Sequence, residues 1–319
     1  MKNLPEEFRW LEENGCGDVP SRFRCHCCFQ KLDASGLDVF SKIRCPGCGA
    51  ELTVPVNFAG FHLYKLLHIS RNARIYLARN AILERDVALK IPVNPEMSEY
   101  YRESFETLAR HAHPGVLWIY NSSVCGNFCC GALQLMKLGN CRGATELRRR
   151  FGSSGLIGRL TPVAEALKMF ARRGITHRDI CPGNLLCAES GEIRLANIHP
   201  GGEDAWPNSP RHWRYQSPES LRDMEFSSAA DLYSFSATTY EMLCGAHPFR
   251  SPETPDALMD AMMKQTPVPV SKLNPQVPPV LSELLAAGLD IEPANRPGPD
   301  EVVKAFRLAL NDIMARDFE

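Results

Sequence analysis

The chain has 319 residues, 44% hydrophobic and 23% charged, the proportions of a globular protein with room for a large core. The formal net charge of −1, from 36 basic and 37 acidic residues, gives no overall attraction to nucleic acid or to an anionic membrane. No apolar run has transmembrane length, and the acidic N-terminus does not resemble a secretory signal, so we expect a cytoplasmic protein.

The first predicted element is a tail over residues 1–20, with one short helix around Glu6 to Glu13. Cysteines then become dense: six of the 13 in the chain lie between Cys16 and Cys48. A secreted protein held by disulfides would be shorter and rich in cysteine throughout. We therefore interpret residues 21–56 as a small metal-binding unit.

Two C-x-x-C steps define this unit, one from Cys25 to Cys28 and one from Cys45 to Cys48. Each step places two thiolates on one turn, and two such turns can close a tetrahedral Zn²⁺ site. Cys27 is an alternative ligand to Cys28. The second turn resembles the knuckle of a zinc ribbon, and the polar residues that follow Cys28 favour Cys28. We expect structural zinc, because four thiolates leave no open coordination position. Free thiols on a loop are the alternative, and the pattern does not specify a partner for the ribbon.

From about residue 58 the pattern changes. Short runs rich in Val, Ile and Tyr predict strands, and longer periodic runs predict helices further along, which together indicate an α+β fold. The five prolines between Pro267 and Pro279 predict an extended connection. The strands are expected over residues 61–66, 75–79 and 86–91, and the helices over 161–172, 228–243, 279–289 and 301–314.

The run from His177 to Asn184 reads H-R-D-x-x-x-x-N. It resembles the catalytic loop of eukaryotic-type serine/threonine protein kinases. Further motifs of that family follow the family's order along the chain: Val87–Lys90, Ser217–Glu219, Asp231, Gly245–Phe249 and Asn295–Pro297. The resemblance implies a bilobal fold over residues 58–319, with a small β-rich N-lobe (58–138) and a large helical C-lobe (139–319).

The resemblance also implies roles for individual residues. Asp179 would accept the proton of a substrate hydroxyl, Asn184 would bind a metal ion, and Lys90 would hold ATP phosphates. Asp231 would steady the catalytic loop, and an ion pair would join Arg296 to Glu219. The nucleotide contacts implied in this way are Lys90, Ala88, Ile75, Leu186 and Asn197.

Three working parts of the family are altered in this sequence. The glycines of the phosphate-binding loop are replaced by His68, Ser70 and Ala73, whose side chains restrict the backbone. Ser104 stands where a helix glutamate should pair with Lys90. Glu103 and Glu106 are near, but one step along a helix turns a side chain by about 100°. Arg71 and Arg74 could supply charge to the loop or simply face water.

The third alteration is at Asn197, which stands where Asp-Phe-Gly should begin and supply a metal-binding carboxylate. An amide oxygen lacks the charge that makes a carboxylate a good ligand for Mg²⁺. His199 replaces the glycine of that motif and suggests a turn fixed in one state.

These observations favour a pseudokinase: a kinase fold kept as a binding or regulatory module, with a protein partner and with impaired or metal-independent ATP binding. The alternative is a weakly active or unconventional serine/threonine kinase with a protein substrate. A kinase-like enzyme for small molecules and a nucleic-acid-binding zinc protein are less favoured.

Overall fold

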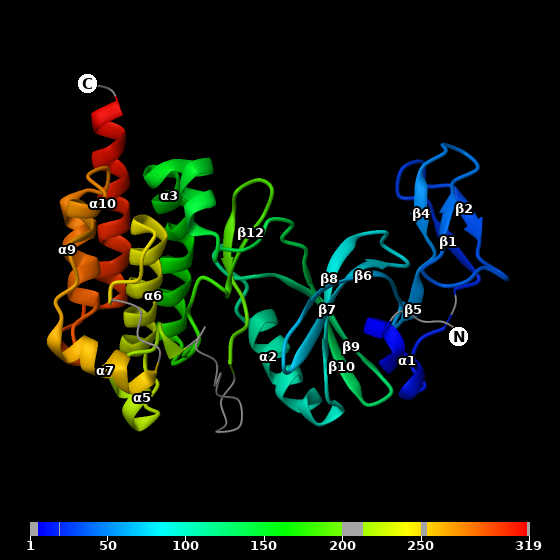
Figure 1. Ribbon diagram of the computed structural model, residues 1–319, viewed down its shortest axis with the longest axis horizontal. Helices are drawn as coiled ribbons and strands as arrows, with labels where there is room; N and C mark the ends of the chain where they lie inside the picture. Colours follow the sequence, from blue (N-terminus) through cyan, green and yellow to red (C-terminus); the bar gives the residue numbers. More distant parts are fainter. Residues whose placement is uncertain (1–5, 19, 200–212, 250–253, 318–319) are drawn as a thin grey trace. The chain divides into compact units, whose positions relative to one another are not determined.

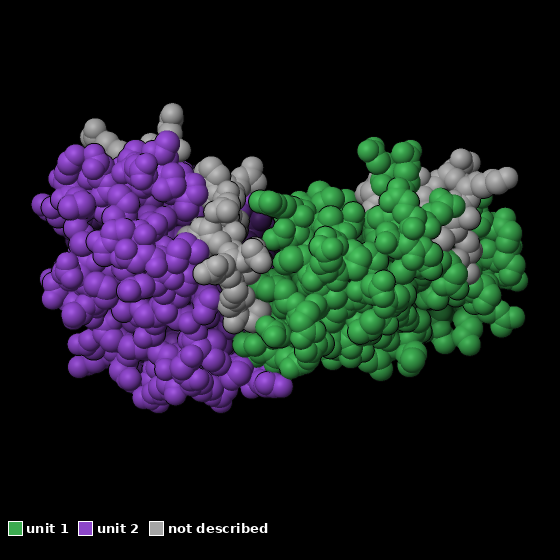
Figure 2. Space-filling model, turned by 90° about the horizontal axis from the view of Figure 1, so that it is seen from below, with its two compact units in different colours: residues 1–109, 118–135 green, residues 110–117, 136–319 purple. Residues whose placement is uncertain are grey.

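The computed structural model describes residues 6–18, 20–199, 213–249 and 254–317. The chain divides into two compact units (Figure 2). Unit 1 comprises residues 1–109 and 118–135, and unit 2 comprises residues 110–117 and 136–319. The kinase-like arrangement of a β-rich N-terminal part and a helical C-terminal part is confirmed, and a cysteine cluster precedes it.

Unit 1 contains a six-stranded antiparallel sheet in the order β5-β6-β7-β8-β10-β9. The three strands predicted in this region are present, each extended by one or more residues. β-branched and aromatic side chains favour these segments because they pack well on a pleated surface. The strands are β5 (Val56–Phe58), β6 (Phe61–Ile69), β7 (Ala73–Asn80), β8 (Asp86–Pro92), β9 (Ile119–Cys125) and β10 (Phe128–Gln134).

Both faces of this sheet are covered. Helix α2 (Ser98–Arg110), preceded by the short helix η2 (Pro95–Met97), packs Tyr101 and Phe105 against one face. Successive strand residues point to opposite faces, so Cys129 joins the cluster under α2 while Cys130 joins the core on the other face. Both cysteines are therefore buried.

The second face is covered by the N-terminal segment, where the sequence predicts a tail. The predicted short helix is present as η1 (Glu6–Phe8) and α1 (Arg9–Glu13). Trp10 is buried, its ring packs edge-on against Phe58 and Phe128, and its Nε1 donates a 2.7 Å hydrogen bond to the Tyr76 hydroxyl. The segment from Glu6 to Glu13 is thus part of the core, because its apolar side chains cover a hydrophobic sheet face.

Two small hairpins form the cysteine unit (Figure 1). They pair β1 (Arg22–Arg24) with β2 (Lys31–Asp33) and β3 (Lys42–Arg44) with β4 (Glu51–Thr53). Phe23, Leu32, Leu52 and Val54 form its apolar core together with two of the cysteines. So small a core supplies little stability alone, which is the usual reason for a structural metal in such a unit.

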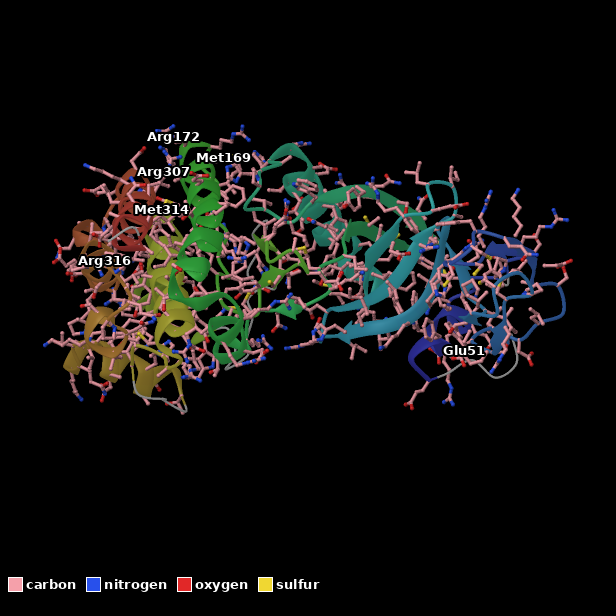
Figure 3. All side chains as sticks on the ribbon, turned by 90° about the horizontal axis from the view of Figure 1, so that it is seen from above. Glu51, Met169, Arg172, Arg307, Met314 and Arg316 are labelled. Atoms are coloured by element: carbon pink, nitrogen blue, oxygen red, sulfur yellow. The ribbon has the colours of Figure 1, made fainter. Side chains whose placement is uncertain are left out.

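Unit 2 is mainly helical, and α6 (Ser228–Cys244) is buried along most of its length. α3 (Ala144–Arg172), α9 (Pro279–Gly288) and α10 (Pro299–Asp317) pack around it or against one another (Figure 1). The four predicted helices are present. Figure 3 labels Arg172 on α3 and Arg307 on α10. Arg307 bonds to Glu165 of α3, and Arg172 bonds to Asp300 of α10.

Local sequence sets the helix boundaries in unit 2. The Ser227 hydroxyl accepts a hydrogen bond from the backbone N–H of Ala230 at the start of α6, and Gly245 ends the helix with φ of +78°. Gly152, with φ of +68° and ψ of 177°, breaks α3 into two helical segments. The remaining elements are α5 (Pro218–Asp223), α7 (Pro255–Lys264), η4 (Pro293–Asn295) and a sheet of β11 (Gly139–Asn140), β12 (Leu185–Cys187) and β13 (Ile193–Leu195).

One connection differs from the sequence prediction. Between Pro267 and Pro279 the extended chain is interrupted by the helical turn α8 (Val270–Leu273). Pro269 precedes this turn, and a proline there does not remove an intrahelical hydrogen bond. Val270 is buried, so packing stabilises the turn. Among the residues that the structure describes, no helix is long and apolar enough to cross a membrane.

Candidate functional site

The four cysteines predicted as metal ligands come together in unit 1. The Sγ atoms of Cys25, Cys28, Cys45 and Cys48 all lie within 4.8 Å of one another. Cys25 Sγ is 3.6 Å from Cys48 Sγ, and Cys28 Sγ is 3.5 Å from Cys45 Sγ. Four Zn–S bonds of about 2.3 Å in a tetrahedron place the sulfurs roughly 3.8 Å apart, so these thiols fit a zinc ion. Cys27 is exposed and does not belong to the cluster.

Both knuckles hold their cysteines by backbone hydrogen bonds. The N–H groups of Cys25 and Cys45 donate to the carbonyls of Gln30 and Ala50 at the opposite side of each turn. Burial alone would raise the pKa of Cys25, but backbone N–H groups and the neighbouring thiols stabilise its thiolate and lower that pKa to about 6. Thiolates are the form that binds zinc, so the turn prepares Cys25 for a metal.

Lys90 lies on β8 in unit 1 and is buried, with 8% of its surface exposed. It is paired across the sheet with Ile75, and Ala88 is paired with Leu77, so the three predicted nucleotide contacts of unit 1 lie close together on β7 and β8. The Lys90 ammonium lies 4.7 Å from the ring centroid of Tyr101 on α2, a cation–π contact. The sequence motifs do not mark Tyr101, although its helical spacing from Phe105 is a signal that could have found it.

The helix position expected to hold a glutamate faces the sheet but carries a small side chain. Ser104 on α2 is buried, whereas Glu103 is exposed. Glu106 forms an ion pair with Arg102, at 2.5 Å, along the outer surface of the helix. The position of the family's glutamate is therefore filled by a buried serine.

The loop that should bind phosphates is a tight turn closed by its own hydrogen bonds. The Ser70 N–H donates to the Ala73 carbonyl at 2.9 Å, and the Ala73 N–H donates to the Ser70 hydroxyl at 3.1 Å. These donors are used within the turn. Arg74 lies with its guanidinium 5.0 Å from the Trp10 ring centroid and donates to the Val93 carbonyl, while Arg71 is exposed.

In unit 2 the catalytic-loop motif is held by Asp231 at the start of α6. Its carboxylate accepts hydrogen bonds from the backbone N–H groups of His177, at 2.6 Å, and Arg178, at 2.9 Å. Arg178 has φ of +71°, a strained value for a non-glycine residue, and Gln216 also bonds to its carbonyl. Burial lowers the pKa of His177 to about 4, so the ring is neutral near neutral pH, and its Nε2 lies 3.0 Å from the Ala196 carbonyl.

The structure brings Asp179, Asn184 and Asn197 together in unit 2. The Asn184 amide donates to the Asp179 carboxylate at 2.5 Å and to its backbone carbonyl at 2.7 Å. The Asn197 amide donates to Oδ1 of Asn184 at 2.7 Å, and Asn197 has φ of +64°, which asparagine tolerates. His199 Nε2 lies 3.5 Å from an Asp179 carboxylate oxygen. Leu186 is half-buried on β12.

The expected pair of Glu219 and Arg296 is present and buried. The guanidinium forms two parallel hydrogen bonds to the carboxylate, of 2.6 and 2.8 Å. Burial alone would raise the pKa of Glu219, but the hydrogen bonds from Arg296 outweigh it and lower that pKa. Arg296 also donates to the backbone carbonyls of Asp290 and Ile291, which lie between α9 and α10. The pair therefore links α5 to the connection between these two helices.

In a comparison with known protein families, residues 70–306 match the protein kinase domain. The chain belongs to the protein kinase family. The matched segment spans most of the chain and includes the catalytic loop, Asp231 and the Glu219–Arg296 pair.

Several curated serine/threonine kinases are similar to this family member. Serine/threonine-protein kinase PknA of Mycobacterium tuberculosis is 27% identical over 260 residues, which cover 76% of this chain and 59% of PknA. Aurora kinase of Dictyostelium discoideum is 25% identical over 71% of this chain and 61% of its own length. The DNA damage-responsive serine/threonine-protein kinase RqkA of Deinococcus radiodurans is 29% identical over 70% of this chain and 36% of its own length. This chain thus spans about three-fifths or less of these relatives.

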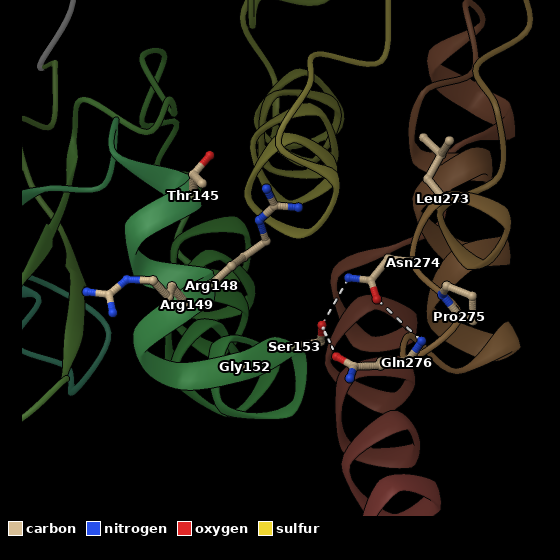
Figure 4. A pocket seen from close by; sticks show the side chains of 9 residues that line it. All are labelled: Thr145, Arg148, Arg149, Gly152, Ser153, Leu273, Asn274, Pro275 and Gln276. Atoms are coloured by element: carbon tan, nitrogen blue, oxygen red, sulfur yellow. Dashed lines mark hydrogen bonds between the residues drawn. The ribbon is translucent and has the colours of Figure 1, made fainter.

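A surface pocket of about 500 Å³ lies elsewhere in the helical unit of this kinase-family chain. Figure 4 shows it between the first part of α3 and the α8–α9 connection. The polar side chains of its wall form hydrogen bonds with one another. The Asn274 amide donates to the Ser153 hydroxyl, which donates to the Gln276 side-chain oxygen. No residue predicted for catalysis or nucleotide contact lines it, so we do not assign it to the kinase site.

Proposed function

We propose that this kinase-family chain is a pseudokinase, a regulatory module that binds a protein partner. ATP binding in this proposal is weak or independent of Mg²⁺. The hydrogen bond from Asn197 to Oδ1 of Asn184 is the observation that carries the proposal.

In protein kinases an aspartate at the position of Asn197 and the catalytic-loop asparagine hold the metal ions that neutralise ATP phosphates. Here the Asn184 side chain accepts from Asn197 and donates to Asp179. Oδ1 of Asn184, the atom that would bind a cation, already has a neutral amide donor. The substitution also removes one negative charge, and metal-based charge stabilisation contributes several kcal/mol in such sites.

The phosphate loop supports the same proposal. Glycine loops bind phosphate through free backbone N–H groups. The Ser70 and Ala73 N–H groups bond within their own turn instead. A phosphate would have to break these bonds before it could be held there.

A weakly active serine/threonine kinase is the second candidate. Asp179, Asn184 and Lys90 are retained, and Asp231 holds the backbone of the catalytic loop by two hydrogen bonds. In that case ATP would supply the phosphoryl group and Asp179 would accept the proton of a protein hydroxyl.

We also propose that the cysteine cluster binds one structural Zn²⁺. Cys25, Cys28, Cys45 and Cys48 supply four thiolates, which fill the tetrahedral shell and leave no position for substrate. The ribbon would then be a second surface for a protein partner, with its fold dependent on the metal.

Nucleotide-dependent melting distinguishes the two kinase proposals. The protein is prepared in metal-depleted buffer without a chelator, since a chelator would also extract ribbon zinc, and is melted with ATP alone or with ATP and Mg²⁺. The pseudokinase proposal predicts an equal shift, or none, in both samples. A shift that appears only with Mg²⁺ favours the active kinase.

A further inference from the structure

Cys16 lies in unit 1 where the segment after α1 meets the sheet, outside the candidate kinase residues and the cysteine cluster. It follows α1 and is 4% exposed. Two residues later, Asp18 exchanges backbone hydrogen bonds of 3.1 and 2.8 Å with Asn57 on β5, an edge strand of the sheet. The backbone that carries Cys16 is therefore firmly placed.

Cys125 ends β9, the other edge strand, and is partly exposed. Cys16 Sγ lies 3.9 Å from the Cys125 carbonyl oxygen, so the two cysteines are neighbours across the junction. The adjacent Gly126 leaves space for the sulfur, since a Cβ there would lie 3.3 Å from Cys16 Sγ. The short segment from Cys16 to Asp18 thus touches both edges of one sheet.

We propose that Cys16 and Cys125 form a reversible disulfide with each other by thiol–disulfide exchange with a small-molecule disulfide such as oxidised glutathione. The bond would fasten the N-terminal segment to the β9–β10 hairpin and so join the two sheet edges. This inference concerns unit 1 and is independent of whether the kinase site is active.

The reaction takes two exchange steps. The partly exposed Cys125 loses its proton and attacks glutathione disulfide, forming a mixed disulfide and releasing one glutathione thiolate. Cys16 then loses its proton and attacks the Cys125 sulfur, releasing the second glutathione. Two protein thiols are oxidised and one glutathione disulfide is reduced to two thiols. Burial, with a further contribution from Cys125, raises the pKa of Cys16 and keeps this thiol protonated, so the partly exposed Cys125 is the thiol that reacts first.

The consequence would be a more firmly attached N-terminal segment. Trp10, Leu11 and Phe8 cover the sheet face opposite α2. In the reduced protein only packing and hydrogen bonds hold this segment, whereas the disulfide would close a loop between residues 16 and 125 and restrict the unfolded chain. Transient disulfides of this kind are the usual form in reducing compartments.

Peptide mapping tests the proposal on full-length, zinc-loaded protein incubated with oxidised glutathione. Trypsin cleavage at Arg9 and Arg22, and at Arg110 and Lys137, yields peptides 10–22 and 111–137. We expect mass spectrometry without reductant to find these peptides joined through residues 16 and 125, and separated by dithiothreitol. Zinc content measured before and after oxidation checks that the ribbon thiols remain bound.

Matched variants give the controls. Cys129→Ser should keep the link, because Cys129 packs under α2 on the opposite face. Cys16→Ser and Cys125→Ser should lose the link and the oxidation-dependent rise in melting temperature. If Cys16→Ser does not fold, Cys16→Ala replaces it. Stable glutathionylation of Cys125 with Cys16 still reduced would overturn the proposal, as would a wild-type protein that shows no link at full oxidation.

Discussion

The amide of Asn197 donates a 2.7 Å hydrogen bond to Oδ1 of Asn184, and Asn184 donates in turn to the Asp179 carboxylate. In the proposed function, the amide at position 197 replaces a charged metal ligand and belongs to a chain of hydrogen bonds that ends at Asp179. Asp231 still accepts hydrogen bonds from the backbone of the catalytic loop. The Asn184 oxygen, which in the family would bind a metal ion, accepts a hydrogen bond from Asn197. This relationship is the basis of the proposed pseudokinase function.

Restoring the carboxylate should restore a response to metal. Asn197→Asp is expected to strengthen Mg²⁺-dependent ATP binding by at least about tenfold, or about 1.4 kcal/mol. The reason is that a carboxylate binds Mg²⁺ and cannot donate to Asn184. Calorimetric titration with and without Mg²⁺ measures the change. Asn197→Ala is the matched control, since it frees the Asn184 oxygen without adding a ligand and should show no gain. If Asn197→Asp also shows none, the Ser70 turn or the surroundings of Lys90 limit binding.

The ribbon should carry one zinc ion. Native mass spectrometry is expected to find one zinc per chain in the wild type, and loss of zinc in Cys25→Ser or Cys48→Ser, since three thiolates bind the ion less well. Cys27→Ser is the control and should retain zinc, because Cys27 is exposed and outside the cluster. A wild-type protein without zinc, with these thiols reduced, would refute the assignment.

The sequence predicts contacts that depend on short, fixed spacings. Two C-x-x-C steps place their thiols by local turn geometry, so the clustering of the four cysteines can be predicted from their spacing. The bonds from Asp231 to the catalytic loop and from Arg296 to Glu219 follow from the family resemblance. Asn197 stands where the family resemblance implies a metal-binding aspartate, so the residue type alone predicts weaker metal binding.

Other contacts depend on how distant segments meet, which no local pattern specifies. The sequence does not reveal the core role of Trp10, because a short helix near the start of the chain gives no sign of the sheet face that it covers. The flanking prolines suggest extended chain at Val270, whereas burial of that side chain favours a helical turn. The position of Tyr101 beside Lys90 depends on how α2 packs on the sheet.

The buried pair of Glu219 and Arg296 should be a large source of stability for unit 2. Glu219→Gln leaves the guanidinium buried without its countercharge and is expected to lower the free energy of unfolding by about 3–5 kcal/mol. Urea unfolding followed by tryptophan fluorescence measures this loss. Glu165→Gln removes a carboxylate from the exposed pair with Arg307 and should change the midpoint little. Equal effects of the two substitutions would contradict the role given to burial.

Buried His247 and His177 should each lower stability on acidification between about pH 6.5 and 4. Burial lowers the pKa of His247 to about 4, and its ring contacts the carbonyls of Arg214 and Phe249; His177 has the same lowered value. In this interval the unfolded state binds more protons, so each histidine costs up to about 1.4 kcal/mol per pH unit as pH falls.

Unfolding midpoints measured across this pH range check the histidine effect. His247→Gln should flatten the slope, because one of the contributing groups is gone. An unchanged slope in His247→Gln would show that other groups control the acid transition.

Phosphate transfer from radiolabelled ATP, with Mg²⁺ or Mn²⁺, is the most direct test of the altered-site account. Wild-type protein and Asp179→Asn are compared on themselves and on a generic protein substrate. The account predicts the same background incorporation in both. Metal-dependent transfer by the wild type that Asp179→Asn abolishes would contradict it and establish an active kinase.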